Sequence, residues 1–421
     1  MSKTKFIVDD EPLFAQCHGS TLAQLPDGRI ITAWFGGTRE SHPDTGIYSS
    51  ILEPGADGWN QIQLVHKISD EAHWNPVFMM DKGETLHLWF KTGAHPWSWE
   101  TWHSVADSST LTWSTPKLLK GQDGAGGHCR GPVRNKPIVL SDGTWLAPSS
   151  HEEKLILEKT KKPYQLVPIK GKPKDLDSYY AMIDRWNSFA DLSSDGGENW
   201  EKTDYIPRPQ EANDSGGVIQ PAAWESSPGK VHMFLRSTWG TIHRTDSEDY
   251  GKTWTPSYNS GLPNNNSGIE VCNLGDGALA LVYNPISGNW AGRGVLRVSF
   301  SNDNGVTWLG DFDLEHSGVG SYAYPSAIVT DEGLAVSYTW NRVSICCALL
   351  KVDKEAILAG SADCCGLLNP QTRPASMQSR RMSKMNISRA HKVQLRQQRL
   401  ELNKSYDGVV DWEARKDFLV E

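Results

Sequence analysis

Ser247-Glu-Asp-Tyr-Gly-Lys-Thr-Trp254 decides the fold, because its pattern S-x-D-x-G-x-T-W recurs as Ser301-Asn-Asp-Asn-Gly-Val-Thr-Trp308. A third copy, with Asn in place of Thr, reads Ser193-Ser-Asp-Gly-Gly-Glu-Asn-Trp200. In each copy we expect the Asp to accept hydrogen bonds from its own turn and the Gly to take a positive φ. The pattern therefore predicts a hairpin corner, after which Thr and Trp begin a new strand.

The three copies are evenly spaced, since their terminal Trp residues stand at 200, 254 and 308, intervals of 54 residues. A fixed period of this length marks an array of similar units, and units of several short strands indicate propeller blades. Degenerate turns ending at Trp59 and Trp113 continue the series, and a last unit runs from Ser321 to about Val352. We expect an all-β, six-bladed β-propeller of four-stranded antiparallel blades over residues 1–352, although a seventh blade stays open. The N-terminal strand is expected to close the ring against the last blade.

Two segments interrupt or follow this pattern. Trp113 and Trp200 are separated by one period plus about 33 residues. We interpret the Lys- and Pro-rich segment at about 152–177 as an insertion of about this length. After residue 352 the hairpin signals stop. Residues 353–421 are basic over part of their length and are predicted to be a solvated tail, partly helical or disordered.

Composition narrows the function. The 421 residues carry a net charge of −8, which argues against general nucleic-acid binding. The sequence has no stretch of 18 apolar residues and no apolar leader. We therefore expect a cytoplasmic protein that does not contact a membrane. Seven Cys without a CxxC pair indicate neither disulfides nor zinc, and no cofactor or metal is expected. An anionic ligand would need a local cluster of Arg.

The repeated turns and their period resemble the sialidase (neuraminidase) superfamily, in particular its bacterial and fungal sialidase-like branch with BNR repeats. The resemblance covers about residues 1–352. It implies that Asp195, Asp249 and Asp303 of the repeated turns are structural, since in that family these turns lie away from the substrate. It also implies a site with three Arg that hold a sugar carboxylate, an acid/base Asp, and a Tyr nucleophile activated by a Glu.

Four residues stand where the resembling family has its site. Arg236 and Arg293 precede the Ser247 and Ser301 turns and match the second and third Arg. Tyr324, in Ser-Tyr-Ala-Tyr-Pro-Ser, matches the nucleophile, and Asp44 matches the acid/base. A neutral Tyr avoids the repulsion that a carboxylate nucleophile would meet beside an anionic sugar.

Two positions depart from the family pattern, and a second cluster lies near them in the sequence. His18 replaces the first Arg, and Gln220 replaces the activating Glu, whose proton-accepting role an amide cannot fill. His18 is a candidate for the missing base or for a hydrogen bond to the ligand. Arg130, Arg134 and Asn135 either supply the charge lost with the first Arg or pair with acidic residues of a neighbouring blade.

Three functions remain open on these residues. The first is a sialidase-like, exo-acting glycoside hydrolase that cleaves a terminal acidic sugar from a glycan with retention, although hydrolysis of simple sialosides is expected to be weak. The second is a lyase on a uronate, in which His18 and Tyr324 share the proton transfers. The third is a non-catalytic propeller that binds glycans. In each case the partner is an acidic carbohydrate.

Overall fold

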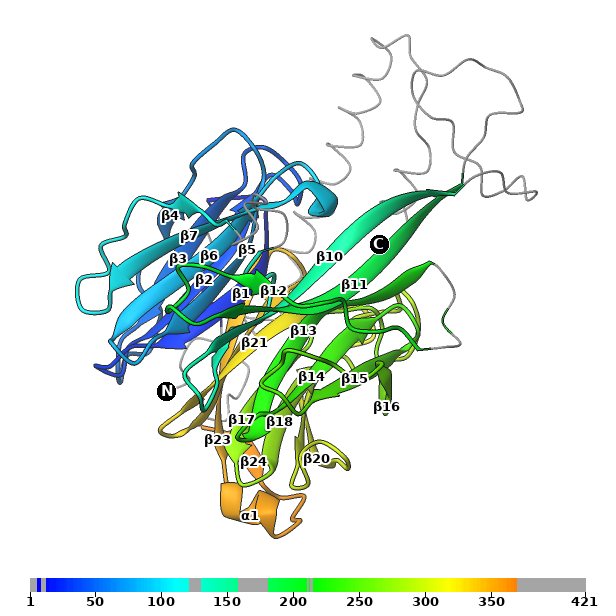
Figure 1. Cartoon of the computed structure of the whole chain (residues 1–421). Helices are drawn as coiled ribbons and strands as arrows, with labels where there is room; N and C mark the ends of the chain where they lie inside the picture. The colour runs from blue at the N-terminus through cyan, green and yellow to red at the C-terminus, as the bar shows by residue number, and fades with distance from the viewer. Residues whose placement is uncertain are drawn as a thin grey trace. The chain divides into compact units, whose positions relative to one another are not determined.

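The computed structural model describes residues 6–8, 13–120, 130–157, 181–209, 212 and 215–368, and every structural statement below concerns these residues. They form 24 β-strands, one α-helix of five residues and one short 3₁₀ turn, so the fold is all-β as predicted (Figure 1). No helix in this part of the chain is long and apolar enough to cross a membrane. Most of the predicted insertion and most of the predicted tail, residues 158–180 and 369–421, lie outside the described residues.

The N-terminal strands form two four-stranded antiparallel sheets, each connected in sequence order. The first sheet contains β1 (Gln16–Gln24), β2 (Ile30–Gly37), β3 (Gly46–Leu52) and β4 (Gln63–His66). The second contains β5 (His73–Met80), β6 (Thr85–Thr92), β7 (Glu100–Asp107) and β8 (Lys117–Leu118), with the 3₁₀ turn η1 (Pro96–Ser98) before β7. Strands β2 and β6 are buried along nearly their whole length, on both faces, which explains why they are rich in aliphatic and aromatic residues.

The middle of the chain forms one sheet of eight strands rather than two separate sheets of four. Its members are β9 (Ile138–Val139), β10 (Trp145–Leu157), β11 (Ala181–Ser193), β12 (Glu201–Lys202), β13 (Gly216–Ser227), β14 (Lys230–Ser237), β15 (Thr241–Ser247) and β16 (Tyr258–Pro263). A short parallel pairing of β11 with β13 joins the two halves, and it pairs Trp186 with Gly217. At Gly217, where φ is 140°, a Cβ would collide with the Trp186 carbonyl, so glycine permits the two strands to meet.

Two further four-stranded antiparallel sheets complete the described fold. They contain β17 (Glu270–Gly275), β18 (Ala278–Tyr283), β19 (Val295–Ser301) and β20 (Leu309–His316), and then β21 (Tyr322–Thr330), β22 (Gly333–Trp340), β23 (Ser344–Val352) and β24 (Cys365–Leu367). The helix α1 (Lys354–Leu358) connects β23 to β24, and the Asp353 carboxylate caps it by accepting from the Ala356 amide. Strand β24 pairs with β23, so the last sheet extends beyond the predicted boundary at residue 352.

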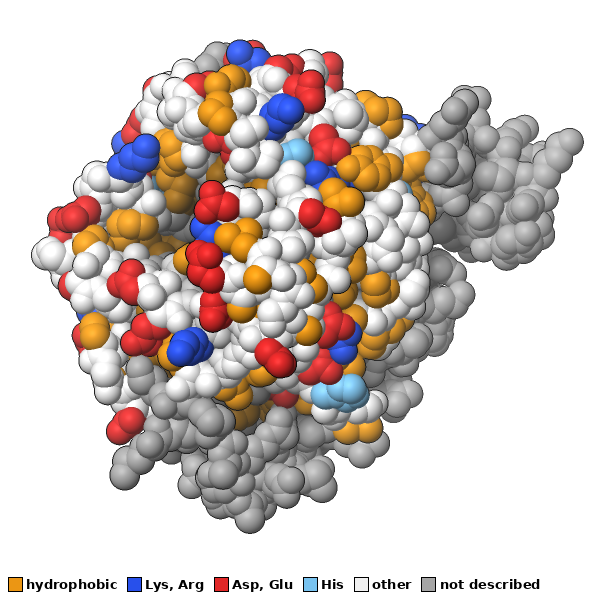
Figure 2. All heavy atoms as spheres, turned by 90° about the horizontal axis from the view of Figure 1, so that it is seen from below, with side chains coloured by type: hydrophobic (Ala, Val, Ile, Leu, Met, Phe, Trp, Pro, Cys, Tyr) orange, Lys and Arg blue, Asp and Glu red, His pale blue; other side chains and the backbone are white. Residues whose placement is uncertain are grey.

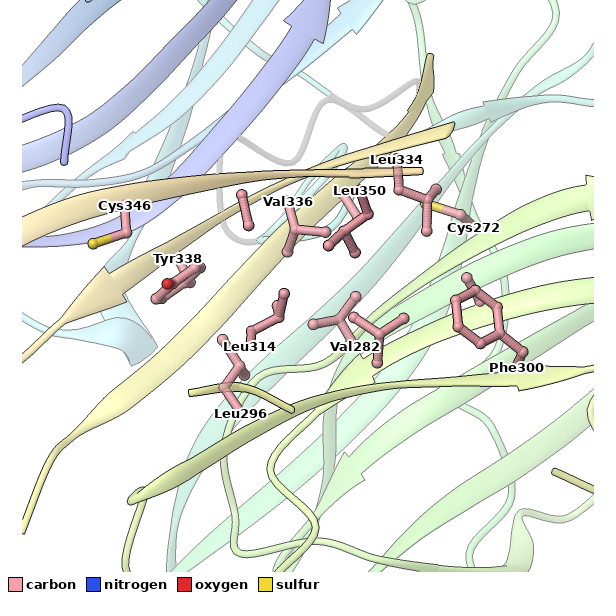
Figure 3. Close-up of a cluster of buried hydrophobic side chains, with 14 of the residues drawn as sticks. Cys272, Val282, Leu296, Phe300, Leu314, Leu334, Val336, Tyr338, Cys346 and Leu350 are labelled. Atoms are coloured by element: carbon pink, nitrogen blue, oxygen red, sulfur yellow. The ribbon is translucent and has the colours of Figure 1, made fainter. Parts of the chain in front are cut away.

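The core of the described residues consists of six clusters of buried side chains, and five of them join strands that are neighbours in the sequence. Figure 3 shows one of them, in which Val282 and Leu296 of one sheet face Val336 and Leu350 of the next. Another cluster packs the first sheet against the last, since it contains Trp34 of β2 and Ile345 of β23 together with others. Burial of this kind stabilises a fold by about 25 cal/mol per Å² of apolar surface.

The N-terminal segment contributes to that contact between the first and last sheets. The Ile7 amide donates to the Ile345 carbonyl at 2.8 Å, and Phe6 forms a bridge with Cys346. The Phe6 ring packs edge-on against Trp340 with a centroid distance of 5.3 Å. The beginning of the described chain is therefore paired with β23, near the end of the predicted propeller.

The repeated turns have the hydrogen bonds expected of their aspartates. In the turn that begins at Ser247, one Asp249 oxygen accepts from the amides of Lys252 and Thr253 at 3.1 and 2.9 Å, and the other accepts from the Thr253 hydroxyl at 2.6 Å. Gly251 has φ 78°. The turns at Ser193 and Ser301 repeat this pattern. These bonds occupy the carboxylates within their own turns, which supports the structural reading of the repeat.

The described surface carries charges of both signs. On the face shown in Figure 2, acidic side chains lie among basic ones, and no broad basic patch gathers among the described residues there. This distribution agrees with the net charge of −8. Any binding of an anion must therefore depend on a local arrangement of cations rather than on the general field of the protein.

Candidate functional site

Tyr324 lies at the centre of a group of cationic side chains. Its hydroxyl accepts a hydrogen bond from Arg236 Nη1 at 2.7 Å. The guanidinium carbons of Arg134, Arg236 and Arg293 lie 5.4, 5.6 and 5.7 Å from the centroid of its ring. These arginines come from the segment before β9, from β14 and from the loop before β19, so the fold brings together residues that are far apart in the sequence.

A strained backbone presents Tyr324 out of its strand. Its φ is 55°, and the register of β21 with β22 shifts between Ala323 and Ser326. Gln220 has φ 51° at an equivalent register shift in β13. Positive φ is uncommon for residues other than glycine and is found preferentially at functional positions. The bulges turn both side chains away from the regular alternation of the sheet.

Gln220 contacts the same arginine as Tyr324. Its Oε1 accepts from Arg236 Nη1 at 2.8 Å, and Asn266 Oδ1 accepts from Arg236 Nε at 2.8 Å. All three side chains are buried. Because Gln220 and Asn266 are neutral, neither of these two partners cancels the charge of Arg236, which is what a carboxylate in place of Gln220 would do. Asn266 was not identified as a site residue from the sequence.

The surrounding charges alter the acidity of Tyr324. Burial raises the pKa of the Tyr324 hydroxyl, but the positive charges of Arg236 and Arg293 and a hydrogen bond with Gln220 outweigh it, so that the pKa lies below its ordinary value of 10.0. A phenol of lowered pKa gives up its proton more readily. The arrangement therefore favours the phenolate, the form in which a tyrosine attacks or accepts a proton.

His18 completes the group on the side of β1. Its ring centroid lies 4.2 Å from that of Tyr324, and its Nδ1 is 2.9 Å from Thr339 Oγ1. The buried Nε2 has no hydrogen-bond partner among the described residues. Burial and the positive charges of Arg342, Arg293, Arg134 and Arg236, in that order, lower the pKa of His18 well below 6.5. His18 is therefore a neutral imidazole near pH 7 with one nitrogen available to a ligand or to a proton.

Arg134 and Asn135 occupy different positions from one another. Arg134 Nη2 donates to the Pro325 carbonyl at 2.6 Å, while its Nε and Nη1 have no hydrogen-bond partner among the described residues. Asn135 Nδ2 donates to the Ile269 carbonyl at 2.6 Å and to Glu270 Oε1 at 3.0 Å. Arg134 thus lies beside Tyr324, whereas Asn135 binds residues at the start of β17.

Arg130 has the alternative role that the sequence left open. Its Nε and Nη2 donate to the two carboxylate oxygens of Asp191, both at 3.0 Å, and Nη2 also donates to the Trp200 carbonyl at 2.7 Å. Both side chains of this ion pair are buried, at 4% and 0% exposure. These contacts match the ion-pair alternative for Arg130, because its planar fork faces a carboxylate.

Asp44 lies in the exposed loop between β2 and β3, and nothing in its contacts joins it to Tyr324. Its oxygens accept from the amide and the hydroxyl of Thr38 at 3.0 and 2.6 Å, and His42 Nδ1 lies 2.7 Å away. Partial burial opposes these contacts, but the bonds from Thr38 and His42 prevail and hold the pKa of Asp44 below its ordinary value. Asp44 is ionised at neutral pH in this arrangement.

Two Trp residues border the same arginine. The guanidinium carbon of Arg236 lies 5.5 Å from the Trp186 ring and 5.6 Å from the Trp290 ring. Trp186 is buried, whereas Trp290 is 60% exposed. The loop that carries Trp290 is fastened by Asn266 Nδ2, which donates to Asn289 Oδ1 at 2.7 Å. An exposed aromatic ring therefore borders the cationic group.

An all-β fold of antiparallel four-stranded groups that brings three arginines around a tyrosine is sialidase-like. The BNR repeat-like domain matches residues 28–336, and the chain belongs to this family. A comparison of the sequence with curated proteins found no match.

Solved structures with the same fold include sialidases of low sequence identity. The Hadza microbial sialidase Hz136 has a TM-score of 0.60 at 15% identity, over 79% of this chain and 65% of that one. The NanB sialidase from Streptococcus pneumoniae has a TM-score of 0.57 at 12% identity, over 82% and 70%. The Trypanosoma rangeli sialidase has a TM-score of 0.57 at 16% identity, over 82% and 58%. The chain thus spans about two thirds or less of the first and third of these proteins, and the likeness shows the fold.

Proposed function

We propose that this protein is a glycoside hydrolase of the sialidase type, which removes a terminal acidic sugar from a glycan with retention of configuration. The observation that carries the proposal is Tyr324, half-buried, with its hydroxyl 2.7 Å from Arg236 Nη1 and its ring bordered by three guanidinium groups. Arg236 and Arg293 hold the sugar carboxylate, and Arg134, whose guanidinium carbon is 5.4 Å from the centre of the Tyr324 ring, adds positive charge. A bidentate, charge-assisted pair of this kind contributes about 1.5–3 kcal/mol per hydrogen bond.

In the proposed first step, Tyr324 Oη forms a bond to the anomeric carbon as the bond from that carbon to the leaving oxygen breaks. The phenol proton passes to His18 Nε2, which is unpartnered. Asp44, which is ionised in its present contacts, first takes up a proton from solvent and gives it to the leaving oxygen. It then deprotonates the water that attacks the anomeric carbon, and Tyr324 leaves with the proton held by His18. For this role Asp44 must exchange its present contacts with Thr38 and His42 for contacts with substrate. The Trypanosoma rangeli sialidase has been solved as a covalent intermediate with 2,3-difluorosialic acid, which supports a covalent mechanism on this fold.

We also propose that the six groups of four strands form a closed six-bladed propeller. Support comes from the two halves of the eight-stranded sheet, which are each antiparallel and meet only through β11 and β13. The cluster between the first and last sheets and the pairing of Ile7 with Ile345 support closure of the ring. A scattering profile or crystal structure with an open array would refute it.

A second function, lyase action on a uronate, is favoured by one observation. His18 is neutral, has a free Nε2 and lies against Tyr324, which is the arrangement needed for a base and an acid on one substrate. In that reaction the base removes the proton beside the carboxylate and the leaving oxygen is protonated, so that a double bond forms in the sugar. Arginine neutralises the carboxylate in both reactions.

One assay separates these functions. The purified protein is incubated with a fluorogenic sialoside and, in parallel, with oligosaccharides capped by a uronic acid. Release of the terminal sugar with retained anomeric configuration supports the hydrolase. A product that absorbs in the ultraviolet selects the lyase, and binding without any turnover selects a glycan-binding propeller. A Tyr324→Phe variant is the control, because it removes the reactive oxygen and keeps the ring.

A further inference from the structure

The turn between β22 and β23 is fastened to both strands that carry the proposed site. The amide of Cys17, the neighbour of His18, donates to the Arg342 carbonyl at 2.8 Å. Asn341 exchanges two hydrogen bonds of 2.7 Å with Ser321, which directly precedes β21 and Tyr324. Asn341 and Arg342 both have positive φ, 50° and 55°. The turn therefore has a defined place beside His18, at the position where the resembling family has its first arginine.

The side chain of Arg342 is paired with a carboxylate from another loop. Its Nη1 donates to Glu40 Oε2, and Glu40 belongs to the β2–β3 loop that also contains Asp44. The two side chains are 25% and 33% exposed, so the pair is accessible to a solute. By contrast, Arg134 is buried at 1% and its Nη2 is bound to a backbone carbonyl.

The charges of this pair reach the site. Burial is the first cause that lowers the pKa of His18, and Arg342 is the first of the charges that add to it. Burial also raises the pKa of Tyr324, and Glu40 acts in the same direction against the arginines. A negative charge placed between His18 and Tyr324 would therefore be attracted by Arg342 and repelled by Glu40.

We propose that Arg342 supplies the cation that is absent at His18, and that the carboxylate of the sugar displaces Glu40 from Arg342 when it binds. The inference rests on the proposed function and extends it to the residue that recognises the substrate acid on the β1 side of the site. Partly exposed ion pairs are weak, so Glu40 is a partner that a ligand carboxylate can replace at low cost. Its release also frees the loop that carries Asp44.

The test measures binding of free N-acetylneuraminate and free glucuronate to the full chain by titration calorimetry. Arg342→Gln is expected to weaken binding about 10- to 100-fold, the loss of one charge-assisted bond. Glu40→Gln is expected to tighten it about threefold, because a competing charge is removed. Arg297→Gln is the matched control, since Arg297 is 26% exposed and paired with Asp311 and Asp313 on another sheet. It should bind as the wild type does.

The two variants are expected to change the sugar affinity in opposite directions, which distinguishes a role in substrate recognition from a role in stability. If Glu40→Gln and Arg342→Gln weaken binding equally and lower the melting temperature equally, the pair is a structural latch and the inference is wrong. The methyl esters of the same sugars should bind wild type and Arg342→Gln alike. If Arg236→Lys abolishes binding while Arg342→Gln leaves it within twofold, the inference fails and the proposed function stands. If the wild type binds neither acid, both fail.

Discussion

Replacing Gln220 by Glu restores the carboxylate that the sialidase-like pattern has beside the tyrosine, whose absence is expected to slow the proposed hydrolysis most. Gln220 Oε1 and the Tyr324 hydroxyl are 2.8 and 2.7 Å from the same nitrogen of Arg236, so the two oxygens are at most 5.5 Å apart. A carboxylate at that distance meets the phenol directly or through one water. General-base catalysis by a positioned carboxylate accelerates a reaction by about 10²- to 10⁴-fold. We expect kcat on a fluorogenic sialoside to rise at least a hundredfold in Gln220→Glu.

The new charge also has a cost that can be worked out. At about 5 Å and an effective dielectric constant of about 20, a unit negative charge opposes the phenolate by about 3 kcal/mol, which raises the pKa of Tyr324 relative to the wild type. The same carboxylate shares Arg236 with the substrate, so KM is expected to increase by about tenfold. A rise in kcat with a smaller rise in KM is the expected signature.

The assay compares kcat and KM for the wild type, Gln220→Glu and Gln220→Met on the sialoside and on a uronic-acid-capped oligosaccharide. Gln220→Met keeps the volume and removes the hydrogen bond to Arg236, so it reports the loss of positioning alone. Melting temperatures show whether each variant is folded. If folded Gln220→Glu gains no turnover on any acidic glycoside, Tyr324 is not a nucleophile awaiting a base, and the reasoning fails.

Four further outcomes are expected. Asp249→Ala should lower the melting temperature by a few degrees and leave sugar binding unchanged, because the carboxylate serves only its own turn. Arg236→Lys should raise KM or Kd for acidic sugars at least tenfold, since an ammonium cannot bind Tyr324, Gln220 and Asn266 together. Arg130→Met should destabilise the fold by about 3–5 kcal/mol in denaturant melts, because it leaves Asp191 buried without its partner. Folding lowers the pKa of His18, so the unfolded chain takes up a proton on this imidazole at a higher pH than the folded chain does. The free energy of unfolding should therefore fall as the pH drops below about 6.5. His18→Gln should remove this part of the pH dependence, measured by denaturant melts at several pH values.

The sequence allowed the architecture to be predicted further than the chemistry. The turn that ends at Trp254 has its Asp and Gly where hydrogen bonding and positive φ require them, and such local rules hold regardless of the rest of the chain. The parallel pairing of Trp186 with Gly217 depends on two strands from different groups and has no local signature. Strand β24 was also missed, because Cys365–Leu367 is too short to show an alternating pattern.

Within the site, spacing identified the arginines but not their partners. Arg236 and Arg293 were expected from their position before two turns, and both lie against Tyr324. For Arg130 the sequence left substrate binding and an ion pair open, and its pairing with Asp191 could not be predicted, because a partner 61 residues away leaves no local pattern. Asn266 and Arg342 likewise act through contacts with distant segments.

One local signal does mark the inner bulges, and it explains why the fold alone does not set the chemistry. Asn75, Gln220 and Tyr324 each have positive φ, each precedes a proline, and each lies at a register shift in the first strand of its group. A proline disfavours the helical conformation in the residue before it and removes an amide from the ladder, so the bulge is built into the sequence. The same kind of bulge therefore carries a side-chain amide at Asn75 and Gln220 and a phenol at Tyr324. A substitution at such a position changes the chemistry while the backbone requirement stays the same. The identity of the residues at these positions, His18 and Gln220 beside Tyr324, therefore bears on the chemistry of this chain more directly than membership of the family does.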